Sequence, residues 1–113
     1  YLLHCTYGMD RTGFSIAVLE ALMGATADEI KADYAKTFMN YCSVVDNMQV
    51  ALTQEQVDLL KDIIAMNMRN SYHTVGVDIS DFDNVDLAAA TEKYLVALGM
   101  EQAEVDALKN RLK

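Results

Sequence analysis

Apolar residues recur at helical spacing along most of the chain, and each run of them predicts an α-helix. The first run covers residues 12–22 and stops before Gly24, a residue type that commonly terminates helices. The second run opens on a capping box at residues 26–29 and predicts a helix that extends toward Tyr41. The apolar stripe of this second helix is expected to face the core.

Three further helices are predicted in the second half of the chain. A capping box at residues 53–56 starts the third helix, which continues through Met68. The fourth covers residues 85–98 and stops at Gly99. The fifth has its cap near Glu101 and reaches almost to the last residue of the chain.

Two parts of the chain lack the helical pattern. Residues 71–84 are polar and acidic with no clear period, and they predict a loop. Residues 1–5 begin with an apolar run that predicts a short β-strand, whose backbone groups need partner strands. We expect those partners in a preceding part of the protein or in a second copy of the chain, which would form a homodimer through this strand.

These elements predict the fold class and the domain organisation. As it stands, the chain is expected to be mainly α, with about five helices and one short strand. The chain begins with a residue other than Met, and residues 1–113 are interpreted as the C-terminal part of one domain. The intact domain would be α/β, with a central sheet that includes residues 1–5 as one strand.

Composition supports a folded domain and excludes several classes of function. The chain has 113 residues and a mass of 12.6 kDa, and 52% of its residues are hydrophobic, which excludes a disordered tail. The net charge of -8 is the wrong sign for holding nucleic acid or anionic lipid by bulk electrostatics. No apolar run approaches the roughly 18 residues of a membrane-spanning helix. Two cysteines are too few for a disulfide scaffold, so a cytoplasmic location is favoured, with secretion left open.

The candidate chemistry lies in residues 4–13, His-Cys-Thr-Tyr-Gly-Met-Asp-Arg-Thr-Gly, between the predicted strand and the first helix. The backbone N–H groups of such a turn can surround a tetrahedral oxyanion beside the positive end of the helix. The same surroundings lower the pKa of a thiol, so we expect Cys5 to be a thiolate at neutral pH. Arg11 lies six positions later and can contact two phosphate oxygens at once.

This segment resembles the Cys-x5-Arg signature of the protein tyrosine phosphatase superfamily, and the longer run is similar to its bacterial tyrosine/serine phosphatase branch. The short signature would occur by chance in about one chain in ten of this length, but the longer run in roughly one in a million. Residues 30–34 and the last helix also resemble this branch. The resemblance implies a strand at 1–5, a phosphate-binding loop at 5–11 and a helical part at 12–113.

The resemblance also implies a role for each residue of the motif. Cys5 would attack phosphorus to give a phosphocysteine, while Arg11 and the loop amides stabilise the transferring group. Thr12 would hydrogen-bond the Cys5 sulfur, and His4 would support the loop. Asp10 would either protonate the leaving oxygen or accept hydrogen bonds from neighbouring amides. The phosphate group would be held by Thr6, Tyr7, Gly8, Met9, Asp10 and Arg11.

The resulting prediction is a cysteine-dependent phosphatase that acts on phosphotyrosine in proteins or on small phosphomonoesters, without a metal or cofactor. A catalytically inactive, regulatory phosphate-binding module is the alternative, because Met9 stands where the branch often has lysine. A second reason is that many members of the superfamily take their general acid from an upstream loop that this chain does not contain. A purely helical interaction domain is a third hypothesis.

Three residues outside the motif are expected to support the loop or the core: Asp33, Tyr34 and Cys42. Asp33 and Tyr34 are expected either to brace the phosphate loop from behind or to serve as a helix cap or core contact. Cys42 lies on an apolar face with no cation nearby in the sequence, and is expected to fill the core.

Overall fold

The computed structural model describes residues 11–44 and 53–113, with side chains for residues 12–39 and from 53 onward. No β-strand occurs within these ranges, so the described chain is mainly helical, as its sequence pattern predicts. The predicted strand at residues 1–5 lies outside them. The helices are α1 (Arg11–Leu22), α2 (Ala27–Val44), α3 (Gln54–His73), α4 (Leu87–Ala97) and α5 (Gln102–Leu112).

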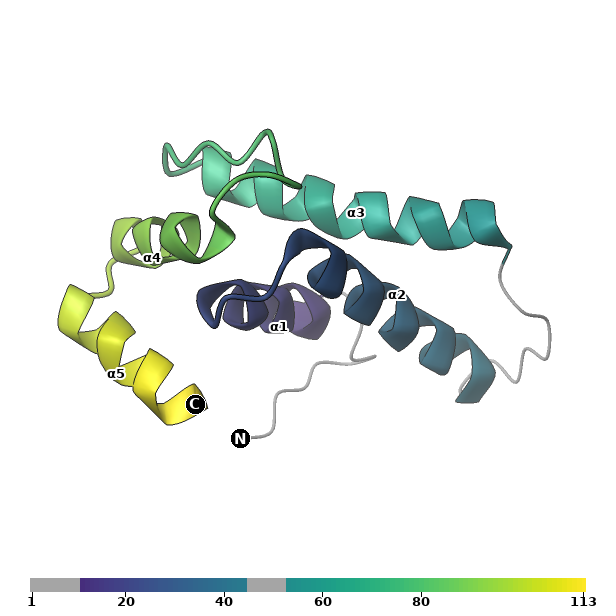
Figure 1. The fold of residues 1–113 in the computed structure, drawn as a ribbon, viewed down its shortest axis with the longest axis horizontal. Coiled ribbons are helices and arrows are strands. Elements are labelled where there is room, and N and C mark those ends of the chain that lie inside the picture. Colours follow the sequence, from purple (N-terminus) through teal and green to yellow (C-terminus); the bar gives the residue numbers. More distant parts are fainter. Residues whose placement is uncertain (1–10, 45–52) are drawn as a thin grey trace.

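Helix α1 lies at the centre of the arrangement (Figure 1). It contacts α2, α3 and α4, whereas α5 contacts α4. This position follows from composition, because a helix that is apolar on almost every side is stable only when it is surrounded by other elements. The buried apolar residues of α1 are Ala17, Val18, Ala21 and Leu22.

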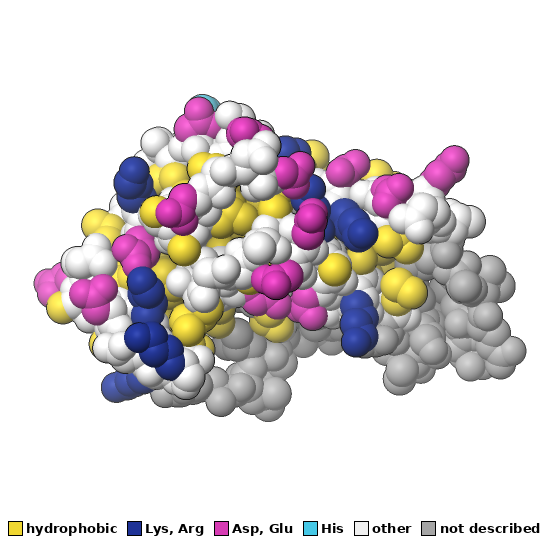
Figure 2. Space-filling model, viewed as in Figure 1, with side chains coloured by type: hydrophobic (Ala, Val, Ile, Leu, Met, Phe, Trp, Pro, Cys, Tyr) yellow, Lys and Arg dark blue, Asp and Glu magenta, His cyan; other side chains and the backbone are white. Residues whose placement is uncertain are grey.

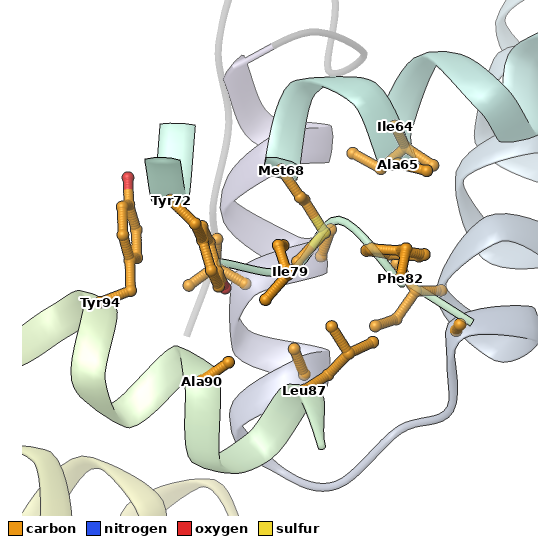
Figure 3. Packing of buried hydrophobic residues seen from close by; sticks show 14 of the residues in the cluster. Ile64, Ala65, Met68, Tyr72, Ile79, Phe82, Leu87, Ala90 and Tyr94 are labelled. Atoms are coloured by element: carbon orange, nitrogen blue, oxygen red, sulfur yellow. The ribbon is translucent and has the colours of Figure 1, made fainter. Parts of the chain in front are cut away.

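The segment between α3 and α4 contributes to the core. The prediction of a loop over residues 71–84 is partly wrong, because α3 continues to His73. Beyond it, the chain buries Val77, Ile79 and Phe82 in the same cluster as the helices (Figure 3). Their spacing has neither a helical nor a strand period, which is why the sequence pattern gave no sign of their burial.

Side-chain caps fix where several helices begin. The capping boxes predicted at residues 26–29 and 53–56 are both present. Helix α4 begins at Leu87, two residues later than predicted, because the Asp86 carboxylate accepts a hydrogen bond of 3.1 Å from the N–H of Ala89. The start of α4 is therefore set by the Asp86 cap, whereas the spacing of apolar residues alone predicted a start two residues earlier.

The predicted helix ends are confirmed by backbone geometry. Gly24 and Gly99 follow α1 and α4 with φ angles of 94° and 116°, a region that residues with a Cβ rarely adopt. The fifth helix begins after Glu101, the predicted cap, which forms a capping box with Glu104. The turn after Gly24 brings α2 back alongside α1, and this contact shapes the region next to the predicted phosphate loop.

Candidate functional site

The predicted phosphate-binding loop ends where α1 begins. Arg11 is the first residue of α1, and its side chain lies outside the described part of the chain. The motif requires a helix directly after the loop, and α1 provides one of 12 residues. The positive end of its dipole therefore adjoins the loop along the chain. The remaining predicted site residues lie outside the described residues: His4, Cys5, Thr6, Tyr7, Gly8, Met9 and Asp10.

Thr12 is the predicted site residue whose side chain the structure describes. It lies in the first turn of α1, and only 7% of its surface is exposed. Its Oγ1 has no hydrogen-bond partner among the described residues. A buried hydroxyl without a hydrogen-bond partner lowers the stability of the fold by about 1–3 kcal/mol, so such groups are rare in folded proteins. The Thr12 hydroxyl therefore indicates a partner outside the described contacts.

Gly13, the last residue of the motif, packs directly against α2. A Cβ added to Gly13 would lie only 3.0 Å from Cε2 of Tyr34 and 3.2 Å from its Cδ2. Tyr34 is itself buried, with 8% of its surface exposed, so its ring has little freedom to move aside. Of the two interpretations of Tyr34, the core contact is confirmed, because its buried ring belongs to the core and packs on Gly13 of α1. Whether it also braces the phosphate loop stays a prediction, since the loop lies outside the described residues.

Two carboxyl groups face one another further along the same contact between α1 and α2. Glu20 on α1 lies close enough to the exposed Asp33 on α2 for the two carboxyl groups to affect one another. They line a narrow cleft with a volume of about 20 Å³, room for one water molecule. The same cleft is lined by Gly13, Ile16, Ala17, Ile30, Tyr34 and Thr37.

The surroundings of Glu20 favour its protonated form. Burial first, and then the neighbouring carboxyl of Asp33, raise the pKa of Glu20 from 4.5 to about 8, with a smaller contribution from Glu29. Glu20 belongs to no motif in the sequence. The available signal was an isolated acid within an otherwise apolar helix, because such a residue must find a polar partner when the helix is buried.

Two larger clefts lie away from this contact. One, of about 240 Å³, lies where the segment before α2 meets the start of α4. The other, of about 210 Å³, lies at the end of α3 and includes Arg69, His73 and Asp78. Hydrogen bonds from Ser80 lower the pKa of Asp78. Neither cleft is lined by Thr12 or Gly13.

Among the described residues, basic side chains form no broad surface on the face shown in Figure 2. Acidic side chains are scattered over this face, and basic ones lie both in a small group at the lower left and singly over the rest of it (Figure 2). The last turn of α5 carries Lys109 and Arg111. Within the described ranges, no group of three His, Cys, Asp or Glu side chains is placed to hold a metal ion. No described helix is both long and apolar enough to cross a membrane.

The sequence model of the tyrosine phosphatase family matches residues 1–113, the whole chain. The chain belongs to the tyrosine phosphatase family. Its mainly helical described part fits the fold expected from the motif. No curated protein and no solved structure matches the chain. Family membership supports a phosphatase, a hydrolase that acts on a phosphorylated substrate.

Proposed function

We propose that this tyrosine phosphatase family member hydrolyses phosphomonoesters, phosphotyrosine in proteins above all, through a phosphocysteine formed on Cys5. The observation that carries the proposal is the spacing of Cys5 and Arg11 directly at the N-terminus of α1. A cysteine in such a loop would lie next to the positive end of a helix and to a guanidinium group, and both would favour the thiolate.

The reaction would proceed in two displacements at phosphorus. In the first, the Cys5 thiolate attacks phosphorus and the ester P–O bond breaks, with Asp10 giving its proton to the leaving oxygen. In the second, water attacks the phosphocysteine and gives one proton to the Asp10 carboxylate, the S–P bond breaks, and inorganic phosphate and the thiolate are released. Arg11 and the loop amides would stabilise the charge on the equatorial oxygens in both steps.

The orphaned hydroxyl of Thr12 supports this assignment. It is buried in the first turn of α1, one residue after Arg11, and lacks a partner among the described residues. A hydrogen bond from Thr12 Oγ1 to the Cys5 sulfur would satisfy the hydroxyl. It would also stabilise the thiolate when it leaves phosphorus in the second displacement.

The charge balance of the chain limits how the substrate is held. With a net charge of -8, the protein repels polyanions at long range, so the phosphate must be held by the loop and Arg11. Met9 in place of lysine removes one cation from the loop. We therefore propose substrates with a single accessible phosphate group, met in the cytoplasm, rather than phosphate-rich lipids.

The decisive experiment is hydrolysis of a small aryl phosphate by the full chain, with orthovanadate as competitor. We expect vanadate-sensitive turnover that Cys5→Ser abolishes and the matched variant Cys42→Ser retains. Inorganic phosphate should still bind to Cys5→Ser, because the loop amides and Arg11 are unchanged. Turnover that persists in Cys5→Ser would refute the phosphocysteine mechanism.

Met9 also favours a second candidate, a phosphate-binding module without catalytic activity. The same assay separates the two. Binding of inorganic phosphate that Arg11→Ala abolishes, with no hydrolysis by the unmutated chain at any pH, would identify the binding module instead of the enzyme.

A further inference from the structure

We propose that α3 forms a homodimer interface, in which the outer face of this helix packs against the same face of α3 from a second copy of the chain, in antiparallel orientation. An exposed apolar stripe and an uneven distribution of charge along the helix both favour this arrangement. The dimer would form whether or not the chain hydrolyses phosphomonoesters, so it goes beyond the proposed function.

Helix α3 lies along one edge of the described molecule (Figure 1). Its inner face contacts α1 and α2. The buried residues of α3 recur every three or four positions, as expected for a helix with one face on the core: Leu60, Ile64, Ala65, Met68 and Tyr72. The opposite face is therefore turned away from the other described helices.

Apolar side chains also lie on this outer face. Leu59 is 60% exposed and Met66 is 47% exposed. Ile63 lies between them and is partly buried against the core. The spacing of the three residues places them on one side of the helix, where they form a stripe over two turns. Single exposed apolar residues are common on protein surfaces, whereas a continuous stripe is typical of an interaction surface.

The charges of α3 are separated along the helix. Three exposed acids lie in its first half and two basic residues in its second half, which holds no acid: Glu55, Asp58 and Asp62, then Arg69 and His73. Glu55 precedes the stripe by four residues and Arg69 follows it by three, so they continue the outer face at the two ends of the stripe. Lys61, in the first half, shares the spacing of the buried residues and lies on the inner side.

Antiparallel packing of two copies pairs these features. It places Leu59 of one copy opposite Met66 of the other, and Glu55 beside Arg69, and the two-fold symmetry repeats both contacts. Among the described residues, neither Glu55 nor Arg69 forms an ion pair within its own chain, so both are available to a second copy. Parallel packing would instead bring acid to acid and base to base, which is unfavourable.

The surface is small, so the dimer should be weak. A helix of 20 residues spans about 30 Å, and stable interfaces commonly bury about 800 Å² per partner. Asp62 lies near the two-fold axis and meets the same acid of the second copy. Each copy also carries a net charge of -8, whose repulsion is screened beyond roughly 8 Å at physiological salt. We therefore expect a monomer–dimer equilibrium at high micromolar protein concentration in such salt.

Sedimentation velocity over a range of protein concentrations tests the surface. Leu59→Lys removes an apolar side chain from both halves of the interface, so it should weaken dimerisation at least about tenfold. Leu98→Lys is the matched control, because Leu98 is 57% exposed but lies after α4, and it should dimerise like the unmutated chain. A chain that stays monomeric up to millimolar concentration would overturn the proposal. So would a dimer that Leu59→Lys leaves intact, which would place the contact elsewhere, as at the predicted strand of residues 1–5.

Charge reversal tests the pairing of the two ends. Glu55→Lys and Arg69→Glu should each weaken the dimer about threefold or more, because each change creates two pairs of like charges. The double variant exchanges the two charges and restores opposite signs in the antiparallel dimer, so it should recover part of the loss. Equal affinities in all four proteins, or losses that simply add in the double variant, would refute this pairing.

Disulfide cross-linking tests the orientation of the helices. Leu59→Cys and Met66→Cys are introduced separately into a chain that carries Cys5→Ser and Cys42→Ser. In the antiparallel dimer, position 59 faces position 66 of the second copy, whereas equivalent positions lie about 10 Å apart along the helix axis. Mild oxidation should therefore cross-link a mixture of the two variants much more than either variant alone. Cross-linking that is strongest within each single variant would show parallel packing and overturn the proposal.

Discussion

The ring of Tyr34 on α2 occupies the space that a side chain at Gly13 would need: a Cβ there would lie 3.0 Å from Cε2 of the ring. Gly13 is two residues beyond Arg11, so this contact fixes the first turn of the helix on which the predicted phosphate loop ends. The relationship makes glycine a packing requirement at a position where helix propensity alone would favour alanine.

We expect Gly13→Ala to lower both stability and turnover. Overpacking costs about 1–3 kcal/mol, and the better helix propensity of alanine returns about 1 kcal/mol, so a net loss of roughly 1 kcal/mol is expected. Chemical denaturation and aryl phosphate turnover measure the two effects. Tyr34→Leu in the Gly13→Ala background should recover part of the loss. A Gly13→Ala variant more stable than the parent, with full turnover, would contradict this account of the contact.

Thr12→Val should separate a catalytic hydroxyl from a merely buried one. If Thr12 Oγ1 stabilises the leaving thiolate, replacing it with a methyl group should slow turnover by about 10- to 100-fold, the value of one hydrogen bond to a charged group. Phosphocysteine should then accumulate, visible as a burst of released alcohol before steady state. Stability should be unchanged or higher, since a buried polar group is removed.

The conservative variant provides the control for Thr12. Thr12→Ser keeps the hydroxyl and should retain most of the turnover. Parental rates in Thr12→Val would show that the hydroxyl has no part in the second displacement.

Tyr72 and Thr91 form a buried hydrogen bond of 2.7 Å between α3 and α4, and the Tyr72 ring stacks on Tyr94 with centroids 4.1 Å apart. Tyr72→Phe would leave the Thr91 hydroxyl unpaired in the core, at a cost of about 1–3 kcal/mol. The double variant with Thr91→Val should be less destabilised than the sum of the two single variants. Denaturant titrations of all four proteins measure this coupling, and strictly additive losses would contradict it.

Burial raises the pKa of Tyr72 to about 12, which predicts a pH dependence of the same contact. The folded state keeps the phenol proton above pH 10, where the unfolded chain loses it. Stability associated with Tyr72 is therefore complete below about pH 10 and falls as the pH rises toward 12. Tyr72→Phe should lessen this alkaline loss, as measured by Tm against pH, and an unchanged slope would count against it.

Phe82 should contribute far more to the stability of the fold than its charged neighbour Asp83. It is 2% exposed, so Phe82→Ala should cost about 3–5 kcal/mol through lost burial and a cavity. Asp83 forms a salt bridge of 2.5 Å with Lys31 but is exposed, so Asp83→Asn should cost less than about 1 kcal/mol. Denaturant midpoints of the two variants test this order, and comparable losses would show that residues 74–86 are held by charge rather than by packing.

The local sequence determined most of the helices and the chemistry of the motif. Capping boxes at 26–29 and 53–56, and glycines after α1 and α4, act over three or four residues, so their effect can be read directly from the chain. The same holds for the spacing of Cys5 and Arg11, on which the resemblance to the phosphatase family rests. The roles of these two residues stay predictions, because Cys5 and the Arg11 side chain lie outside the described residues.

Two features depend on contacts between residues far apart in the sequence, and only the tertiary structure determined them. The burial of Val77, Ile79 and Phe82 arises from the packing of an irregular segment against several helices, which no short-range period encodes. The raised pKa of Glu20 likewise requires α2 to fold back and place Asp33 opposite it. Helical spacing can place an acid on a helix, but only the packing of two helices can bury it beside a second acid and so raise its pKa.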